Sequence, residues 1–219
     1  MSSLLVKPNG QQGTVIDVTP ENAGWSFVGF KLVKLRPGDI FKFQTEGREY
    51  CLVPVTGAFD ASTNDIQFKG VGGRQNLFAQ ELTEHLFVPE KTRVTITATS
   101  DLELGICSAP GGSGLPARRI GRSDQAQSTR GQSTNTRYIH DILPETQPAN
   151  SLLVVEVFTP AGNWSSYPPH KHCIDNIPEE SALEETYYHR INPPQGFAFQ
   201  RVYTDDRSID ETMAVEDGD

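Results

Sequence analysis

A succession of short strand-forming segments, each ended by a turn signal, constrains the fold of this chain most. Residues 40–44 alternate apolar and polar side chains, and residues 152–158 form a strongly β run that ends at Thr159-Pro160-Ala161-Gly162. The segment Asn192-Pro193-Pro194-Gln195-Gly196 is a further turn. The sequence contains no long amphipathic helical pattern. Short strands at regular spacing therefore predict an all-β sandwich or barrel.

Length and charge narrow the class of protein. The chain has 219 residues, enough for one large or two small domains, and it carries 19 glycines and 15 prolines, which suits a turn-rich β protein. The net charge is −9, and no basic cluster exceeds the pair Arg118-Arg119. We therefore expect no nucleic-acid partner. An anionic small-molecule substrate remains compatible, because the electric field of a site is local.

The cysteines and the N-terminus indicate the compartment. Cys51, Cys107 and Cys173 are odd in number and widely spaced. The first residues lack the charged start and apolar run of a secretory signal, and no segment approaches the length that spans a membrane. The sequence therefore predicts a cytoplasmic protein with no membrane partner.

A His-x-His pair follows two prolines. Pro168 and Pro169 disfavour a helix through His170, because proline lacks a backbone donor and pushes the preceding residue toward extended geometry. On an extended strand, residues two apart face the same side, so His170 and His172 would project together. The alternative is that both imidazoles are exposed on a loop.

A second segment repeats this spacing. Glu185, Tyr187 and His189 lie two apart among strand formers. Two adjacent strands could bring two imidazoles and one carboxylate together, as in a catalytic metal site with three protein ligands. Cys173, next to His172, is interpreted as a bystander rather than as a ligand.

The motifs resemble a known family. A glycine, then His-x-His, then a glutamate on the next strand and a glycine turn resemble the first motif of the cupin barrels. The segments GNWSSYPPHKH, LEETYYHRINPPQGFAFQRVYTDDRS and DETMAVEDGD are similar to the 5-deoxy-glucuronate isomerase family of inositol catabolism, and the resemblance runs over the whole chain. It implies a bicupin that converts 5-deoxy-glucuronate to 2-deoxy-5-keto-gluconate with a divalent metal, zinc or manganese.

The resemblance also implies a division of the chain into four parts. These are an N-terminal arm, a first cupin barrel without metal, an Arg-rich linker or lid, and a second barrel with the metal site: residues 1–21, 22–108, 109–137 and 138–219. Relatives usually place an acidic residue where this chain has Cys173. The second cupin motif, with a fourth ligand histidine, is expected beyond Asp219, so we expect a longer natural chain and an incomplete second barrel.

By motif matching, the metal ligands are His170, His172 and Glu185, while Glu184 faces away. An aldose–ketose isomerase needs a group that polarises the carbonyl oxygen and a base beside the carbon. Candidate catalytic residues are His189 and Tyr187. Arg201 is the candidate for binding the substrate carboxylate. The ordinary alternatives are an exposed His189, a core Tyr187, and an Arg201 paired with Asp205 or Asp206.

Two other functions stay open at this stage. One is a 4-deoxy-5-keto-uronate ketol-isomerase of pectin breakdown, which shares the fold and the ligand logic. The other is a non-catalytic, metal-free bicupin that binds sugars. The expected partner is a small uronic acid, and the chain could form a homo-oligomer.

Overall fold

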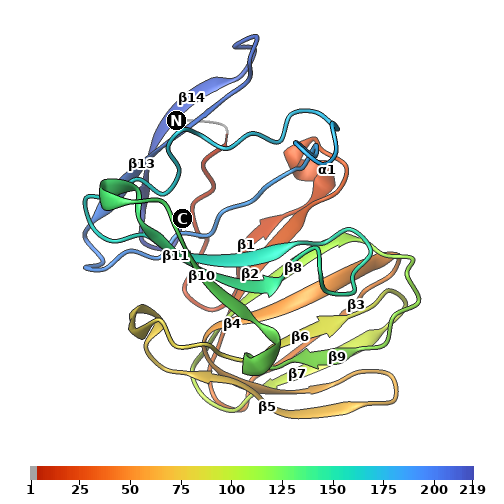
Figure 1. Cartoon of the computed structure of the whole chain (residues 1–219). Helices are drawn as coiled ribbons and strands as arrows, with labels where there is room; N and C mark the ends of the chain where they lie inside the picture. The colour runs from red at the N-terminus through yellow and green to blue at the C-terminus, as the bar shows by residue number, and fades with distance from the viewer. Residues whose placement is uncertain (1–3) are drawn as a thin grey trace. The chain divides into compact units, whose positions relative to one another are not determined.

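A computed structural model describes residues 4–219, and its regular structure is almost entirely β (Figure 1). This confirms the all-β class. The chain divides into two compact units, Gln12–His170 and Lys171–Asp219 with the N-terminal residues through Gln11, and each is described by itself. Among the described residues, no helix is long and apolar enough to cross a membrane.

The larger unit contains twelve strands, one α-helical turn and three 3-10 turns. Its strands are β1 Gly13–Val18, β2 Gly29–Leu35, β3 Ile40–Gln44, β4 Arg48–Ser62, β5 Gln67–Arg74, β6 His85–Val88, β7 Arg93–Ala98, β8 Leu102–Pro110, β9 Arg118–Ile120, β10 Ala126–Arg130, β11 Arg137–Leu143 and β12 Val154–Phe158. The short helices are α1 Pro20–Ala23, η1 Leu77–Ala79, η2 Arg122–Asp124 and η3 Ser133–Asn135.

The long strand β4 builds the main sheet. Its first part pairs with β8 and β6, within the strand order β1-β2-β8-β4-β6-β9, and its second part pairs with β5 and with β7, which also pairs β3. The pairing partners change around the irregularity between Pro54 and Thr56 and at Gly57, which has φ 85°. A Cβ at Gly57 would lie 2.0 Å from the Asp101 carbonyl oxygen, so only glycine fits there.

Alternation along the strands creates two hydrophobic cores. Leu52 and Leu86 belong to one buried cluster with Phe59, Ile96 and other residues of β4, β7 and β8. Their neighbours Cys51 and Phe87 face the opposite side, where they pack with Ile120, Ile142 and Leu152 in a second cluster. The second cluster joins the main sheet to the separate three-stranded sheet β10-β11-β12.

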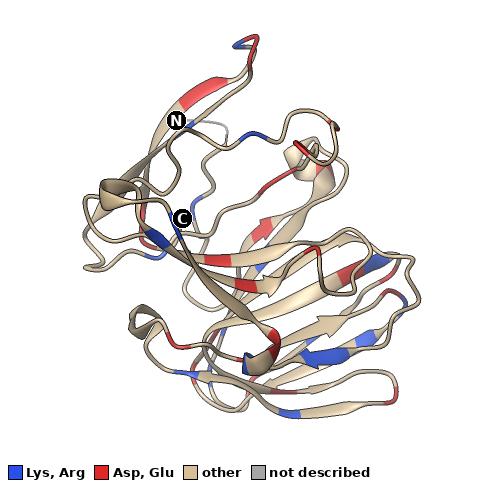
Figure 2. Ribbon diagram, viewed as in Figure 1, with Lys and Arg blue, Asp and Glu red and all other residues tan. Residues whose placement is uncertain are grey.

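The segment expected to be an Arg-rich linker or lid contains regular structure. β9 pairs with β6, and β10 pairs with β11. The consecutive arginines that colour β9 blue in Figure 2 both have local roles, because Arg118 lies 4.3 Å over the Phe87 ring and Arg119 forms an ion pair with Glu84. A function as a lid, and the four-part division, stay predictions.

In the smaller unit, β13 Phe197–Tyr203 and β14 Asp210–Glu216 form an antiparallel hairpin. The strands predicted through residues 170–172 and 185–189 are wrong, because the described chain has no regular strand there. Two physical reasons account for this. Pro168, Pro169 and Pro178 cannot donate to a ladder, and the backbone of His189 exchanges hydrogen bonds with Gly218 and Asp219, which lie beyond the end of β14.

Candidate metal centre

His170, His172 and Glu185 come together although neither segment is a strand. One ligand atom from each residue lies within 4.8 Å of the others. His170 and His172 lie near each other because only Lys171 separates them in the sequence. The Nε2 atom of His172 lies 3.6 Å from the Glu185 carboxylate. The structure thus gathers the three predicted metal ligands.

Hydrogen bonds orient both imidazoles. The Nδ1 of His172 lies 3.1 Å from the Ser181 carbonyl oxygen, which can only accept, so Nδ1 carries the proton and Nε2 is left as the ligand atom facing Glu185. The His170 backbone amide donates to Ser166 Oγ at 3.1 Å, and its Nδ1 lies 3.4 Å from the same oxygen. Bonds of this kind fix the tautomer and orientation of metal-binding histidines.

The donor set suits a divalent transition metal. Two imidazoles and a carboxylate are typical ligands of zinc and manganese, and catalytic sites keep a position open to substrate. His170 and Glu185 are exposed and His172 is half-buried, so the group is open to solvent. Cys173 is not part of this group, and its backbone amide donates to Glu180 Oε1 at 2.7 Å. The three residues could therefore hold a metal ion.

Tyr187 contacts Glu185, and His189 in turn contacts Tyr187. The Tyr187 hydroxyl donates to Glu185 Oε2 at 2.7 Å, and its ring stacks on His189 with centroids 6.2 Å apart. Burial and the nearby Glu185 raise the pKa of Tyr187, so its hydroxyl keeps its proton. The Nε2 of His189 contacts Gln200 Oε1 at 3.1 Å, and burial lowers the pKa of His189. The imidazole is therefore neutral at neutral pH.

Arg201 is engaged by Asp210. Its Nε and Nη2 donate to the two oxygens of that carboxylate, each at 2.8 Å, and the guanidinium lies 5.2 Å over the Tyr203 ring. The hydrogen bonds to Asp210 raise the pKa of Arg201. The ordinary alternative was therefore right about pairing, but the partner is neither Asp205 nor Asp206. A substrate carboxylate would have to compete with Asp210.

The sequence analysis missed a buried polar cluster in the larger unit. Arg74 donates to both oxygens of Glu156, at 2.8 and 2.6 Å, and His140 Nδ1 lies 3.2 Å from Glu156 Oε2. The side chains of Arg74 and His140 are 1% and 3% exposed, which makes this a desolvated ion pair. The available signal was the presence of His140 and Glu156 inside apolar strand-forming runs. The register of β11 and β12 places these two residues directly opposite each other.

The chain thus has an antiparallel all-β fold with a His-His-Glu group that could hold a metal ion. The chain belongs to the KduI/IolB family, whose model matches residues 4–219. It is 49% identical to a 5-deoxy-glucuronate isomerase of Geobacillus kaustophilus, over 100% of this chain and 80% of the relative. The 5-deoxy-glucuronate isomerase of Bacillus subtilis is 46% identical, over 98% of this chain and 82% of the relative.

A solved structure gives the same result. The crystal structure of an IolB-like protein from Salmonella typhimurium matches with a TM-score of 0.96 and 45% identity. The match covers 99% of this chain and 82% of that protein. The path of this chain is therefore that of an IolB-like protein almost throughout.

Proposed function

We propose that this chain is an aldose–ketose isomerase that converts 5-deoxy-glucuronate to 2-deoxy-5-keto-gluconate in inositol catabolism. The observation that carries the proposal is the 49% identity, over the whole of this chain, to a relative named 5-deoxy-glucuronate isomerase. The gathered His-His-Glu group supports the same reading, because such isomerisation needs a group that polarises a carbonyl.

A divalent ion, zinc or manganese, would be held by His170, His172 and Glu185. The ion would supply Lewis acidity at the carbonyl oxygen of the substrate. The donor atoms lie within 4.8 Å of one another, whereas ligands about 2.0–2.2 Å from one ion lie closer together, so a small inward movement would accompany binding.

The other residues have roles that their contacts support. His189 is neutral and suits a base that removes the proton from the carbon beside the carbonyl and returns it to the neighbouring carbon. Tyr187 keeps its proton and orients the Glu185 carboxylate through their hydrogen bond. Arg201 is the candidate for the substrate carboxylate, in exchange for Asp210.

The proposal also covers the substrate class, the assembly and the location of the protein. The substrate is a small uronic acid, and the chain could assemble as a homo-oligomer. A cytoplasmic location is supported by the three free cysteines, Cys51, Cys107 and Cys173. A 4-deoxy-5-keto-uronate ketol-isomerase is the second candidate, and a substrate panel separates the two.

An activity assay tests the proposal. The full-length protein is incubated with 5-deoxy-glucuronate and with 4-deoxy-5-keto-uronate, with and without a chelator. We expect turnover of the first substrate, its loss on chelation, and its recovery with zinc or manganese. The matched variants are Glu185→Ala, which should lose metal and activity together, and its neighbour Glu184→Ala, which should keep most of both. Activity only on the second substrate, or activity unaffected by Glu185→Ala, would overturn the assignment.

A further inference from the structure

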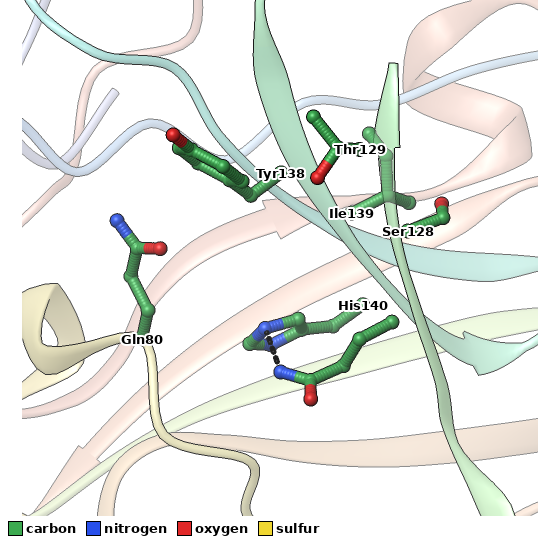
Figure 3. Close-up of a pocket in the computed structure, with 7 residues that line it drawn as sticks. Gln80, Ser128, Thr129, Tyr138, Ile139 and His140 are labelled. Carbon is green, nitrogen blue, oxygen red and sulfur yellow. Dashed lines mark hydrogen bonds between the residues drawn. The ribbon is translucent and has the colours of Figure 1, made fainter.

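A hollow of about 260 Å³ lies in the larger unit. It is formed by β10, β11 and the residue that follows η1, and its lining is Gln80, Gln127, Ser128, Thr129, Tyr138, Ile139 and His140 (Figure 3). Sites for drug-sized ligands measure roughly 300–1,000 Å³, so this volume suits a smaller molecule. None of its lining residues belongs to the His170, His172 and Glu185 group.

The lining offers hydrogen bonds without a carboxylate, lysine or arginine. Gln80 and Gln127 present amides, and Thr129 presents a hydroxyl. Figure 3 shows the Gln80 amide directed toward the space between Tyr138 and His140. Tyr138 is 38% exposed, and its ring provides an apolar surface. An aromatic face beside neutral donors and acceptors fits a compact molecule with hydroxyls around a hydrocarbon frame.

Contacts of His140 with Gln127 and Glu156 orient the side chains at the floor of the hollow. The Nε2 of His140 lies 2.9 Å from Gln127 Nε2, while its Nδ1 lies 3.2 Å from Glu156. With the Gln127 amide nitrogen as donor, His140 carries its proton on Nδ1 and donates to Glu156. Burial raises the pKa of Glu156, but hydrogen bonds from His140 and Arg74 outweigh it, so the pKa lies below its ordinary value. The ion pair with Arg74 cancels the carboxylate charge behind the floor.

The rim carries a backbone conformation that is uncommon for its residue type. Gln80 ends η1 with φ 57°, in the left-handed region. A non-glycine residue there costs free energy unless the surroundings fix it, and such residues concentrate at functional sites. This conformation positions the amide of Gln80 at the edge of the hollow.

We propose that this hollow binds a small uncharged sugar or polyol, through the amides of Gln80 and Gln127 and the ring of Tyr138. His140 positions Gln127 from below. The neutral lining disfavours an anionic sugar, because a carboxylate would find no cation to replace its water.

Saturation-transfer NMR on the full-length protein tests this site, with D-glucose and D-sorbitol as neutral probes and D-glucuronate as the anionic comparison. A chelator is present throughout, so that the outcome does not depend on the proposed metal centre. We expect transfer to both neutral probes in the wild type. The variants Gln80→Gly, which relieves the backbone conformation, and Tyr138→Leu should each weaken binding about five- to tenfold.

Matched controls are Gln132→Ala and Tyr167→Leu, which change an exposed glutamine and an exposed tyrosine outside the hollow. Both should bind the neutral probes like the wild type, and thermal melting checks that all four variants are folded. No transfer to either neutral probe, transfer to D-glucuronate alone, or binding of the neutral probes that is as strong in both hollow variants as in the wild type would each overturn the proposal.

Discussion

The Glu49 carboxylate accepts a hydrogen bond of 2.9 Å from the backbone amide of Leu152, 103 residues further along the chain. The amides of Asn150 and Ser151 donate to the same carboxylate, so three successive N–H groups surround it. Glu49 is fully buried. The Glu49 carboxylate is thus engaged by backbone amides and ties residues 150–152 to β4.

Replacing Glu49 should destabilise the fold. Glu49→Ala leaves the buried amide of Leu152 and the partly buried amides of Asn150 and Ser151 without an acceptor, and we expect a loss of about 3 kcal/mol in the free energy of unfolding. Glu49→Gln keeps one carbonyl acceptor and should cost less. Denaturant unfolding measures both, with the exposed Glu46→Gln as a control. Equal stability of Glu49→Ala and the control would show that water replaces these bonds.

Acidification should lower the free energy of unfolding through protonation of His85. Burial is the main cause that lowers the pKa of His85 to about 4 from 6.5, and its Nδ1 has no hydrogen-bond partner in the described chain. Because the unfolded chain takes up this proton first, stability is complete above about pH 6.5 and falls as the pH drops toward 4.

The predicted loss is at most about 3 kcal/mol. It is measured as the difference between the pH dependence of unfolding for the wild type and for His85→Gln. The difference should be confined to pH 4–6.5. Parallel stability profiles of the two proteins in that range would contradict the prediction.

The cysteines should differ sharply in reactivity. Cys51 and Cys107 lie opposite each other on β4 and β8, and burial raises the pKa of both thiols, that of Cys107 to about 12. Cys173 is exposed. Because the thiolate is the reactive form, iodoacetamide at pH 8 should label Cys173 first. Mass spectrometry of peptides locates the label, and rapid labelling of Cys107 in the folded protein would contradict this expectation.

Removing the Tyr187 hydroxyl should show whether its hydrogen bond to Glu185 contributes to metal affinity. Tyr187→Phe deletes the 2.7 Å hydrogen bond to Glu185. Loss of such a partner typically weakens metal affinity by about 10- to 100-fold. Calorimetric titration of the apoprotein with zinc measures the change, and Tyr167→Phe, an exposed tyrosine, is the control. Unchanged affinity in Tyr187→Phe would show that Glu185 does not need this bond.

The all-β class could be predicted from the sequence, because strand-forming segments and glycine–proline turns are local signals. Most segments assigned to strands by their pattern are strands in the structure, such as β3 and β12. The alternation that aligned Glu185, Tyr187 and His189 also anticipated their contacts. The strands assigned to the two metal-binding segments were wrong, because a ladder requires a neighbouring strand, which the local sequence does not specify.

Contacts between distant residues were the hardest to foresee. Asp210, rather than Asp205 or Asp206, pairs with Arg201, because the register of the β13–β14 hairpin decides which carboxylate lies within reach. Asp205 instead pairs with Lys171, and Asp206 bonds Thr204 and Ser208 within its own turn. The cluster of Arg74, His140 and Glu156 likewise depends on how β5, β11 and β12 come together.

Because β4 pairs with β8 and β6 in its first part and with β5 and β7 in its second part, the order in which this unit folds is constrained. Residues 48–56 of β4 cannot complete their pairing with β8 until Leu102–Pro110 have been synthesised and brought back. Such distant pairing makes folding slow, on the order of milliseconds to seconds. Until β8 arrives, one edge of β4 stays unpaired and prone to association with other chains. A break in the chain within β4 would separate the strands that pair with its first part from those that pair with its second part.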